Sequence, residues 1–139
     1  MNLSDPSETF RQEARELLEQ LESGLLDLEQ SPGNDDLVNS TFRALHTIKG
    51  SGAMFGFTAV AAFVHEFETA FDQVRKGQSS VTPALIAVAL DAKDHIHLLI
   101  EAPDAMVAGG DAILERLRLA VSGTTLDLVA PEAPPSLPL

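Results

Sequence analysis

The chain has 139 residues, 45% of them hydrophobic, and a formal net charge of −12, which fits one folded domain with a single core. Such a surplus of negative charge repels phosphate backbones and anionic lipids, which argues against nucleic acid and membrane surfaces as partners. The charge either keeps the protein soluble or indicates that its partners are proteins. Charged residues interrupt every apolar stretch before the roughly 18 residues that span a membrane, and the lack of cysteine excludes disulfides and thiolate metal sites.

The first of five helical segments begins at residues 5–8, where Asp5 is the expected N-cap and Glu8 closes a capping box. A proline and a glycine within residues 31–34 end it. Between these limits apolar residues recur at steps of three and four, which predicts one buried stripe. The stripe consists of Phe10, Ala14, Leu17, Leu21, Leu25 and Leu28.

Two further helices are predicted from the same periodicity. The second covers about residues 36–55, and Gly56 is expected to be its left-handed cap. Its core-facing residues are Val38, Phe42, Leu45 and Ile48. Thr58 is expected to cap the third helix, which ends before Gly77. Three phenylalanines of this helix have core spacing: Phe63, Phe67 and Phe71.

A fourth helix is predicted to open at Thr82 and to stop at Pro103, and a fifth begins near Asp111. Short connections between long amphipathic helices favour an all-α fold, an antiparallel up-and-down four-helix bundle with an additional C-terminal helix. This domain is expected to cover residues 1–122. Residues 123–139 contain four of the eight prolines and are expected to be an extended linker that continues into further chain. No signal peptide is expected at the start, and a cytoplasmic location is compatible with the lack of cysteine.

The most unusual segment is FRALHTIKGSGAMFGF, residues 42–57. On a helix, His46 lies at the margin of the core-facing side, where one ring edge meets water, and Lys49 and Gly50 are its neighbours one turn on. Two glycines inside a helix cost roughly 1 kcal/mol each relative to alanine, so each needs a reason. Gly50 leaves bare backbone that another molecule can approach, and Gly52 is expected to serve helix packing. An accessible imidazole beside a cation suits phosphoryl acceptance.

A nucleophilic imidazole needs a defined tautomer, which a carboxylate that accepts from the other ring N–H would supply. The third helix carries Ala61, His65, Glu68 and Asp72 along one stripe. If the second and third helices form a hairpin joined at Gly56, His46 lies about ten residues before the turn and Glu68 about twelve after it. The spacing therefore permits contact between these two side chains.

The segment at residues 42–57 resembles the phosphorylation-site helix of the N-terminal histidine phosphotransfer domain of chemotaxis histidine kinases. AAFVHEFETAFDQVRKG, at residues 61–77, resembles the next helix of that family, and the similarity extends over about residues 5–122. The resemblance implies a four-helix bundle with a fifth helix appended.

By this resemblance, five residues have roles. His46 would be phosphorylated at Nε2, and Glu68 would hold the proton on Nδ1. Lys49 would stabilise the phosphoryl group, His65 would be an accessory member of the hydrogen-bond network, and Gly50 would open access.

The resemblance also implies partners. A histidine kinase catalytic domain, in the same chain or another, would bring the phosphoryl group from ATP, and a CheY-like response-regulator receiver domain would take it onto an aspartate. The family's ATP-binding boxes are not in this sequence, so no cofactor is expected here; Mg²⁺ would be bound by the kinase and the receiver. The expected docking rim around the histidine consists of Arg43, Thr47, Ala53 and Met54.

Other interpretations of the same residues remain open at this point. His46 can be a structural histidine, and Lys49 and Glu68 can be ordinary surface charges. His65, Glu68, Asp72 and His46 also supply ligand types for a metal site, although the paired Glu-x-x-His motif of di-iron bundles is absent and no metal is expected. A helical adaptor with an acidic first helix as its partner face is the third alternative. His95 and His97 are spaced too closely to face the same way and are assigned no role.

Overall fold

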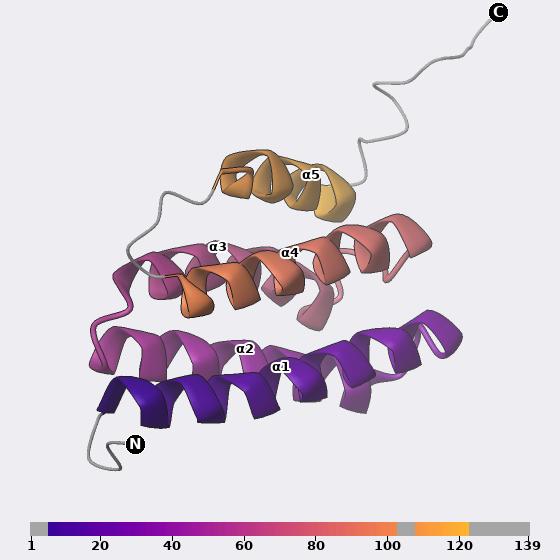
Figure 1. Cartoon of the computed structure of the whole chain (residues 1–139). Coiled ribbons are helices and arrows are strands. Elements are labelled where there is room, and N and C mark those ends of the chain that lie inside the picture. Colours follow the sequence, from indigo (N-terminus) through magenta and orange to yellow (C-terminus); the bar gives the residue numbers. More distant parts are fainter. Residues whose placement is uncertain (1–5, 103–107, 123–139) are drawn as a thin grey trace, which may run out of the picture.

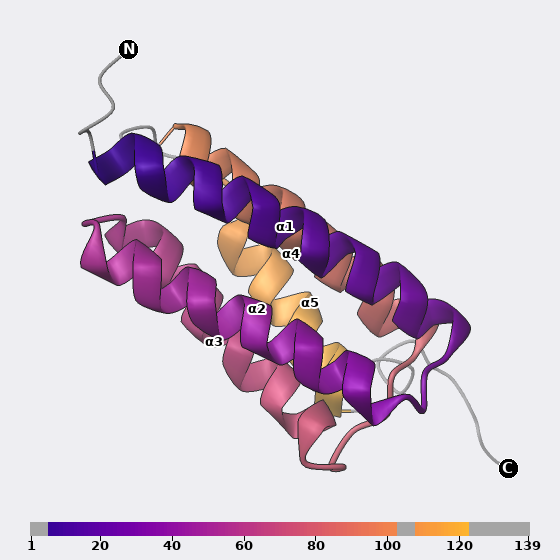
Figure 2. The same cartoon turned by 90° about the horizontal axis from the view of Figure 1, so that it is seen from below.

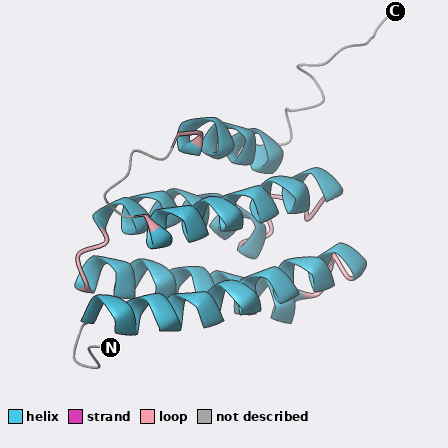
Figure 3. Cartoon of the chain, in the orientation of Figure 1, coloured by secondary structure: helices cyan, strands magenta, loops and turns pink. Residues whose placement is uncertain are grey.

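The computed structural model describes residues 6–102 and 108–122, which form five helices (Figure 1). In chain order these are α1 (Pro6–Gln30), α2 (Asp35–Met54), α3 (Thr58–Arg75), α4 (Pro83–Glu101) and α5 (Gly110–Ser122). The described residues contain helices and loops but no strand, so the predicted all-α class is confirmed (Figure 3). Three predictions lie outside the described residues: the cap at Asp5, the stop at Pro103 and the linker over residues 123–139.

The first four helices form an antiparallel bundle, and α5 lies outside it (Figures 1 and 2). Helix α1 contacts α2 and α4, and α3 contacts the same two helices, so the four close into a ring. Helix α5 contacts α3 and α4 on the side away from α1 and α2. This arrangement confirms the predicted bundle with an additional C-terminal helix.

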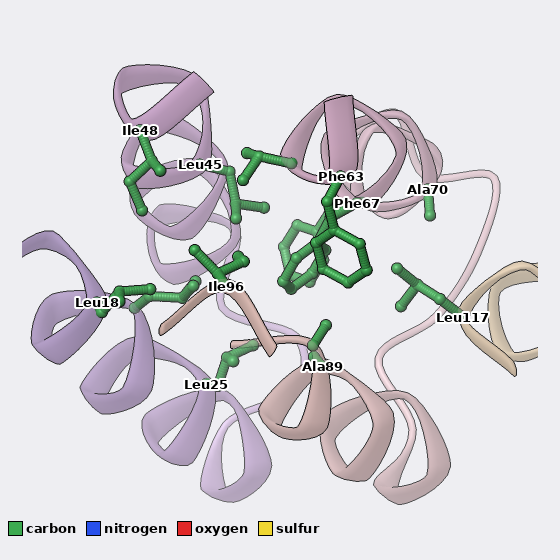
Figure 4. Close-up of a cluster of buried hydrophobic side chains, with 14 of the residues drawn as sticks. Leu18, Leu25, Leu45, Ile48, Phe63, Phe67, Ala70, Ala89, Ile96 and Leu117 are labelled. Carbon is green, nitrogen blue, oxygen red and sulfur yellow. The ribbon is translucent and has the colours of Figure 1, made fainter. Parts of the chain in front are cut away.

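The core lies between the helices and is built from aliphatic side chains around a few phenylalanines. The phenylalanines predicted to be in the core are buried: Phe63, Phe67 and Phe71. Side chains from all five helices meet around Phe67, and Leu117 enters from α5 (Figure 4). In α1, Leu18 is buried and Leu17 only partly buried, which corrects the predicted stripe by one position. No helix among the described residues has the length and apolar character to cross a bilayer.

Three helix boundaries follow the sequence signals. Thr82 is the N-cap of α4, and its Oγ1 accepts a hydrogen bond from the backbone N–H of Leu85 at 3.1 Å. Gly56 and Gly77, which follow α2 and α3, have φ angles of 85° and 79°. This left-handed conformation is open to glycine because it has no Cβ, so both helices end where the glycines predict.

Two helix starts differ from the prediction. Asn34 caps α2, and its side-chain oxygen accepts from the backbone N–H three residues on at 3.2 Å, so the helix begins slightly earlier than expected. Thr58 is the first residue of α3 and not its cap; Phe57 precedes it and makes no side-chain cap bond. The Phe57 N–H instead donates to the Gly52 carbonyl at 2.8 Å, which ties the start of α3 to the end of α2. Backbone bonds within this turn therefore replace the expected side-chain cap.

Glycines inside α1 and α2 differ in what surrounds them. A Cβ added at Gly24 of α1 would lie 2.8 Å from Oγ1 of Thr41 on α2, too close for an undisturbed contact. Thr41 is buried, and its hydroxyl has no hydrogen-bond partner among the described residues. A Cβ added at Gly50 would meet no atom within 4 Å. Gly24 thus serves the packing of α1 on α2, whereas the packing of the bundle does not require glycine at Gly50.

Alanine at these two glycines is expected to change stability in opposite directions. Gly50→Ala should raise the free energy of unfolding by about 1 kcal/mol, because alanine is the better helix former and nothing obstructs its methyl group. Gly24→Ala should not show this increase. Its free energy of unfolding should equal that of wild type or be lower, because Thr41 must move to make room for the new methyl group. Urea unfolding measures both; a Gly24→Ala protein as stable as Gly50→Ala would contradict the close packing.

Candidate functional site

His46 lies on α2 where the helix faces α3, and its side chain is 65% exposed. The ring therefore stands at the edge of the core, as its helical position predicts. Leu45, the preceding residue, is fully buried, which fixes the rotation of α2 and keeps the histidine at the margin. A group in solution or on a docked protein can reach the outer edge of this ring.

Glu68 of α3 joins two residues of α2 through its carboxylate. One carboxylate oxygen, Oε2, lies 2.6 Å from Nδ1 of His46, and the other, Oε1, lies 2.7 Å from Nζ of Lys49. The Glu68 side chain is only 9% exposed, so it is not an ordinary surface charge. The contact that the hairpin spacing permitted between His46 and Glu68 is present in the structure.

This contact selects the tautomer of the imidazole. A carboxylate accepts hydrogen bonds, so Nδ1 of His46 is the donor to Glu68. A neutral ring that carries its proton on Nδ1 has a free lone pair on Nε2. The geometry therefore supplies a nucleophilic nitrogen on the far side of the ring from the carboxylate.

The charge of Glu68 depends on the same partners. Burial by itself raises the pKa of this carboxyl group, but hydrogen bonds from Lys49 and His46 and their charges outweigh burial. The pKa of Glu68 therefore lies below its ordinary value of 4.5, and the group is an anion at neutral pH. A buried carboxylate of this kind can hold a proton on the imidazole and offset positive charge that develops there.

Lys49 is held by this ion pair, and its side chain is 28% exposed. Lys49 is therefore not the ordinary surface charge of the alternative interpretation. Lys49 follows His46 by one helical turn on the same side of α2, so its ammonium group lies next to the edge of the site.

The residues expected to form the docking rim all lie on the exposed surface of α2. Met54 is 74% exposed, which is unusual for so large an apolar side chain. The Thr47 hydroxyl donates to the Arg43 carbonyl at 3.0 Å within the helix. Gly50 lies one turn after His46, toward Ala53 and Met54, with open space where a side chain would be. The structure thus places Arg43, Thr47, Ala53 and Met54 where a partner can contact them.

His65 does not join the network of His46, Glu68 and Lys49. Its side chain is exposed and forms no hydrogen bond among the described residues, and its backbone carbonyl accepts from the Thr69 hydroxyl at 2.9 Å. Sequence position alone predicted a shared stripe with Glu68, but the rotation of α3 buries Glu68 and turns His65 to solvent. An accessory role for His65 therefore stays a prediction.

The metal-site interpretation finds no ligand set in the structure. No three histidine, aspartate or glutamate side chains converge among the described residues, and Lys49 occupies the second oxygen of Glu68. His95 and His97 face different ways, as their spacing predicted: His95 is buried against Phe63, with ring centroids 4.7 Å apart, and His97 is exposed.

Phe42 was predicted to lie in the core, and this prediction is wrong in part. The side chain is half-buried, and its ring stacks beside that of His46, with centroids 6.4 Å apart and planes 16° apart. Arg75 of α3 covers the Phe42 ring, with its guanidinium carbon 4.3 Å from the centroid. The signal was the four-residue spacing of Phe42 and His46, because helical side chains lean toward the preceding turn. Arg75 gave no comparable signal in the sequence.

The family model of the Hpt domain matches residues 7–106. The chain belongs to the Hpt domain family. The chemotaxis protein CheA of Rhizobium meliloti is 32% identical to this Hpt domain over 99% of the chain and 19% of the relative. CheA of Cereibacter sphaeroides is 39% identical over 73% of the chain and 15% of the relative. The chain thus spans less than a fifth of the length of these curated relatives.

Solved structures of the same kind of domain have the same fold. The solution structure of the histidine phosphotransfer domain of CheA aligns with a TM-score of 0.75 and 27% identity, covering 85% of this chain and 92% of that one. The CheA phosphotransferase domain from Thermotoga maritima aligns with a TM-score of 0.68 and 30% identity, covering 76% and 100%. The phosphorylated P1 domain of CheA3 in complex with CheY6 from R. sphaeroides has 24% identity and a TM-score of 0.74, covering 85% and 96%, so this match concerns the fold alone.

The lowered pKa of Glu68 predicts how the stability of this Hpt domain depends on pH. Because the folded pKa lies below 4.5, the stability contributed by the ionised carboxylate is present above about pH 4.5 and is lost as the pH falls through the folded value. Glu68→Gln cannot titrate, so its free energy of unfolding should fall less than that of wild type between about pH 5 and pH 3. Urea unfolding at several pH values measures the difference.

A suitable control is Glu66→Gln, because Glu66 is an exposed glutamate on the same helix. This variant should keep the wild-type pH dependence. Equal slopes for wild type and Glu68→Gln would contradict an ionised Glu68 held by Lys49 and His46.

Proposed function

We propose that this Hpt domain accepts a phosphoryl group on Nε2 of His46 and passes it to an aspartate of a response-regulator receiver domain. The observation that carries the proposal is an exposed imidazole whose Nδ1 is held by the buried carboxylate of Glu68. The relatives support it, since they are chemotaxis CheA proteins and one solved neighbour is a histidine phosphotransfer domain of CheA.

In the first step, Nε2 of neutral His46 attacks the γ-phosphorus of ATP held by a kinase domain. The N–P bond forms while the bond from phosphorus to the bridging oxygen breaks, and ADP leaves with that electron pair. The Nδ1 proton stays on the ring, which therefore becomes positively charged. Glu68 lies 2.6 Å from Nδ1 and offsets this charge as it develops.

Lys49 supplies the cation of the site. In the unphosphorylated domain its ammonium group is 2.7 Å from Glu68 and helps to keep that carboxylate ionised and in place. One turn from His46, the same flexible side chain can turn to the phosphoryl oxygens once they are bound to Nε2. In this proposal Lys49 orders Glu68 before transfer and balances the phosphoryl charge after it.

In the second step, an aspartate oxygen of the receiver attacks the phosphorus. The P–N bond breaks, its electron pair returns to Nε2, and neutral His46 is restored without a proton leaving Nδ1. The receiver domain binds Mg²⁺ for this transfer, and the kinase domain binds Mg²⁺ with ATP, so this chain supplies no metal ligands.

The exposed surface of α2 is the proposed docking site for these partners. Gly50 lets the partner backbone come close to the helix, and Arg43, Thr47, Ala53 and Met54 surround the approach. His65 is exposed one turn before Glu68, and the accessory role in the hydrogen-bond network that the resemblance implies for it stays a prediction.

The chain spans 19% and 15% of its CheA relatives in the two matches above, so the ATP-binding part of such a protein lies elsewhere. We propose that a kinase catalytic domain, in the same polypeptide or in a partner copy, phosphorylates His46. The whole system is proposed to act in the cytoplasm, where ATP is available. The alternative of a helical adaptor without phosphotransfer predicts no label on His46 at all.

Loss of the acceptor nitrogen tests the proposal directly. With a CheA-type kinase and radiolabelled ATP, wild type should acquire a label that is acid-labile and base-stable, as expected of phosphohistidine, and His46→Gln should acquire none. Glu68→Gln should be labelled more slowly, by about 10- to 100-fold, because the amide no longer offsets the charge on the ring. A fully labelled His46→Gln protein would move the site elsewhere, and an unlabelled wild type would favour the adaptor.

A side chain at Gly50 should obstruct docking without harming the fold. Gly50→Gln should slow phosphoryl transfer to a receiver domain by about tenfold, because the new side chain stands on the surface that the partner approaches. Gly33→Gln is the matched control. A side chain there also meets open space, but Gly33 precedes α2 and lies outside the proposed docking surface. Rapid-quench transfer rates and urea unfolding separate the effects. A wild-type rate for Gly50→Gln would remove Gly50 from the docking surface.

A further inference from the structure

A second contact holds the imidazole of His46 besides its hydrogen bond to Glu68. The Phe42 ring lies one turn before His46 on α2, with centroids 6.4 Å apart and planes 16° apart. Helical side chains lean toward the preceding turn, so the histidine ring leans toward Phe42. A ring that is 65% exposed thus has a flat hydrophobic neighbour on the side of the preceding turn, and its outer edge stays open.

Phe42 is itself covered by a residue from the other helix. The guanidinium carbon of Arg75 lies 4.3 Å from the centroid of the Phe42 ring, a favourable position for a cation on an aromatic face. Asp72 holds Arg75 there, because Nη2 and Nε of Arg75 donate to Oδ1 of Asp72 at 2.6 and 2.9 Å. Lys76 contacts the other oxygen of Asp72 at 3.0 Å.

The anchor persists at neutral pH. Hydrogen bonds from Lys76 and Arg75 hold the pKa of Asp72 below its ordinary value, so the carboxylate is ionised whenever the site is in use. The Arg75 side chain is 39% exposed, yet its two bonds to one oxygen and the aromatic face below it define its position. Four residues from two helices therefore form one row: Asp72, Arg75, Phe42 and His46.

We propose that Arg75 is a positioning residue for phosphoryl transfer, which it serves by clamping Phe42 beside the imidazole of His46. This inference rests on the proposed function of His46. The hydrogen bond to Glu68 restrains the ring at Nδ1 only, and a single hydrogen bond tolerates a range of His46 side-chain torsions. Terminal histidine torsions have broad minima, so a neighbour for the ring is needed to set its plane. The clamp on Phe42 supplies that neighbour and directs Nε2 outward.

Arg75 acts in this proposal without touching the reacting atoms. It reaches His46 only through Phe42, and its own charge is largely matched by Asp72. A purely electrostatic role would need the charge of residue 75, whereas a clamp needs the planar group over the ring. Lysine keeps the charge but lacks the planar fork, so Arg75→Lys separates the two roles.

The test combines kinetics with NMR of the His46 ring. Phosphorylation by a CheA-type kinase should show a decrease in kcat of about three- to tenfold for Arg75→Gln, with KM within about twofold of wild type, because misplacement of a nucleophile affects the chemical step. Arg75→Lys should show nearly the same decrease in kcat as Arg75→Gln, because lysine lacks the planar group, and a wild-type kcat for Arg75→Lys would overturn the clamp in favour of a role for the charge alone. Arg118→Gln is the matched control, since Arg118 pairs with Glu115 at the same three-residue spacing on α5, and it should behave as wild type.

A double variant decides whether Arg75 acts through Phe42. If it does, Phe42→Leu and the pair Phe42→Leu with Arg75→Gln should have the same kcat, because the clamp has no ring left to hold. If the two substitutions lowered kcat independently, so that the double variant showed the product of both decreases, the proposal would be overturned. A change confined to KM in Arg75→Gln would also overturn it and would make Arg75 a docking contact.

The NMR measurement is independent of any kinase. In wild type the chemical shifts of the His46 ring protons should show the ring-current effect of Phe42. Arg75→Gln should reduce this effect, while the amide spectrum should show that the fold of the domain is unchanged. Unchanged ring shifts in Arg75→Gln would overturn the clamp. If wild type accepted no phosphoryl group, the proposed function would fail, and the NMR comparison would still decide whether Arg75 orders the ring.

Discussion

The site depends on one buried carboxylate. Burying an anion is unfavourable unless its oxygens are paired, and each oxygen of Glu68 has one partner, Lys49 or His46, both on the neighbouring helix. The ion pair thus links the register of α2 against α3 to the orientation of the imidazole. The same contact that satisfies the buried charge also leaves Nε2 of the histidine as the free nitrogen.

The turn between α2 and α3 makes this contact possible. Gly56 lets the chain reverse with a left-handed residue. Gly52 is buried near Val60 and Phe10, but a Cβ there would make only ordinary contacts, so the expected need for glycine at this position is not evident from the packing. The hairpin then carries His46 and Glu68 to the same height. The second row of contacts, through Phe42, crosses between the same two helices. The α2–α3 pair is therefore both the scaffold and the site.

Sequence reasoning succeeded where a local rule governs the outcome and failed where packing chooses between neighbours. Hairpin geometry showed that His46 and Glu68 could meet, because it brings residues at equal distance from a turn together, and the family resemblance assigned the hydrogen bond between them. His65 and Glu68 were placed on one stripe of α3 from their spacing. The spacing alone does not say which of the two faces inward, and only Glu68 does. Sequence reasoning put Phe42 in the core, because periodicity cannot distinguish a fully buried ring from one shared between the core and the site.

By itself, the sequence determined the five helices, the antiparallel bundle, the glycine ends of α2 and α3, and His46 as an imidazole at the edge of the core. These depend on apolar spacing and on backbone preferences, which act within a few residues of the chain. Only the tertiary structure decided that Lys49 pairs with Glu68 and that Arg75 covers Phe42. Long charged side chains have many rotamers, and their partners are selected by which helix face lies opposite, a relation that helical spacing within one segment does not contain.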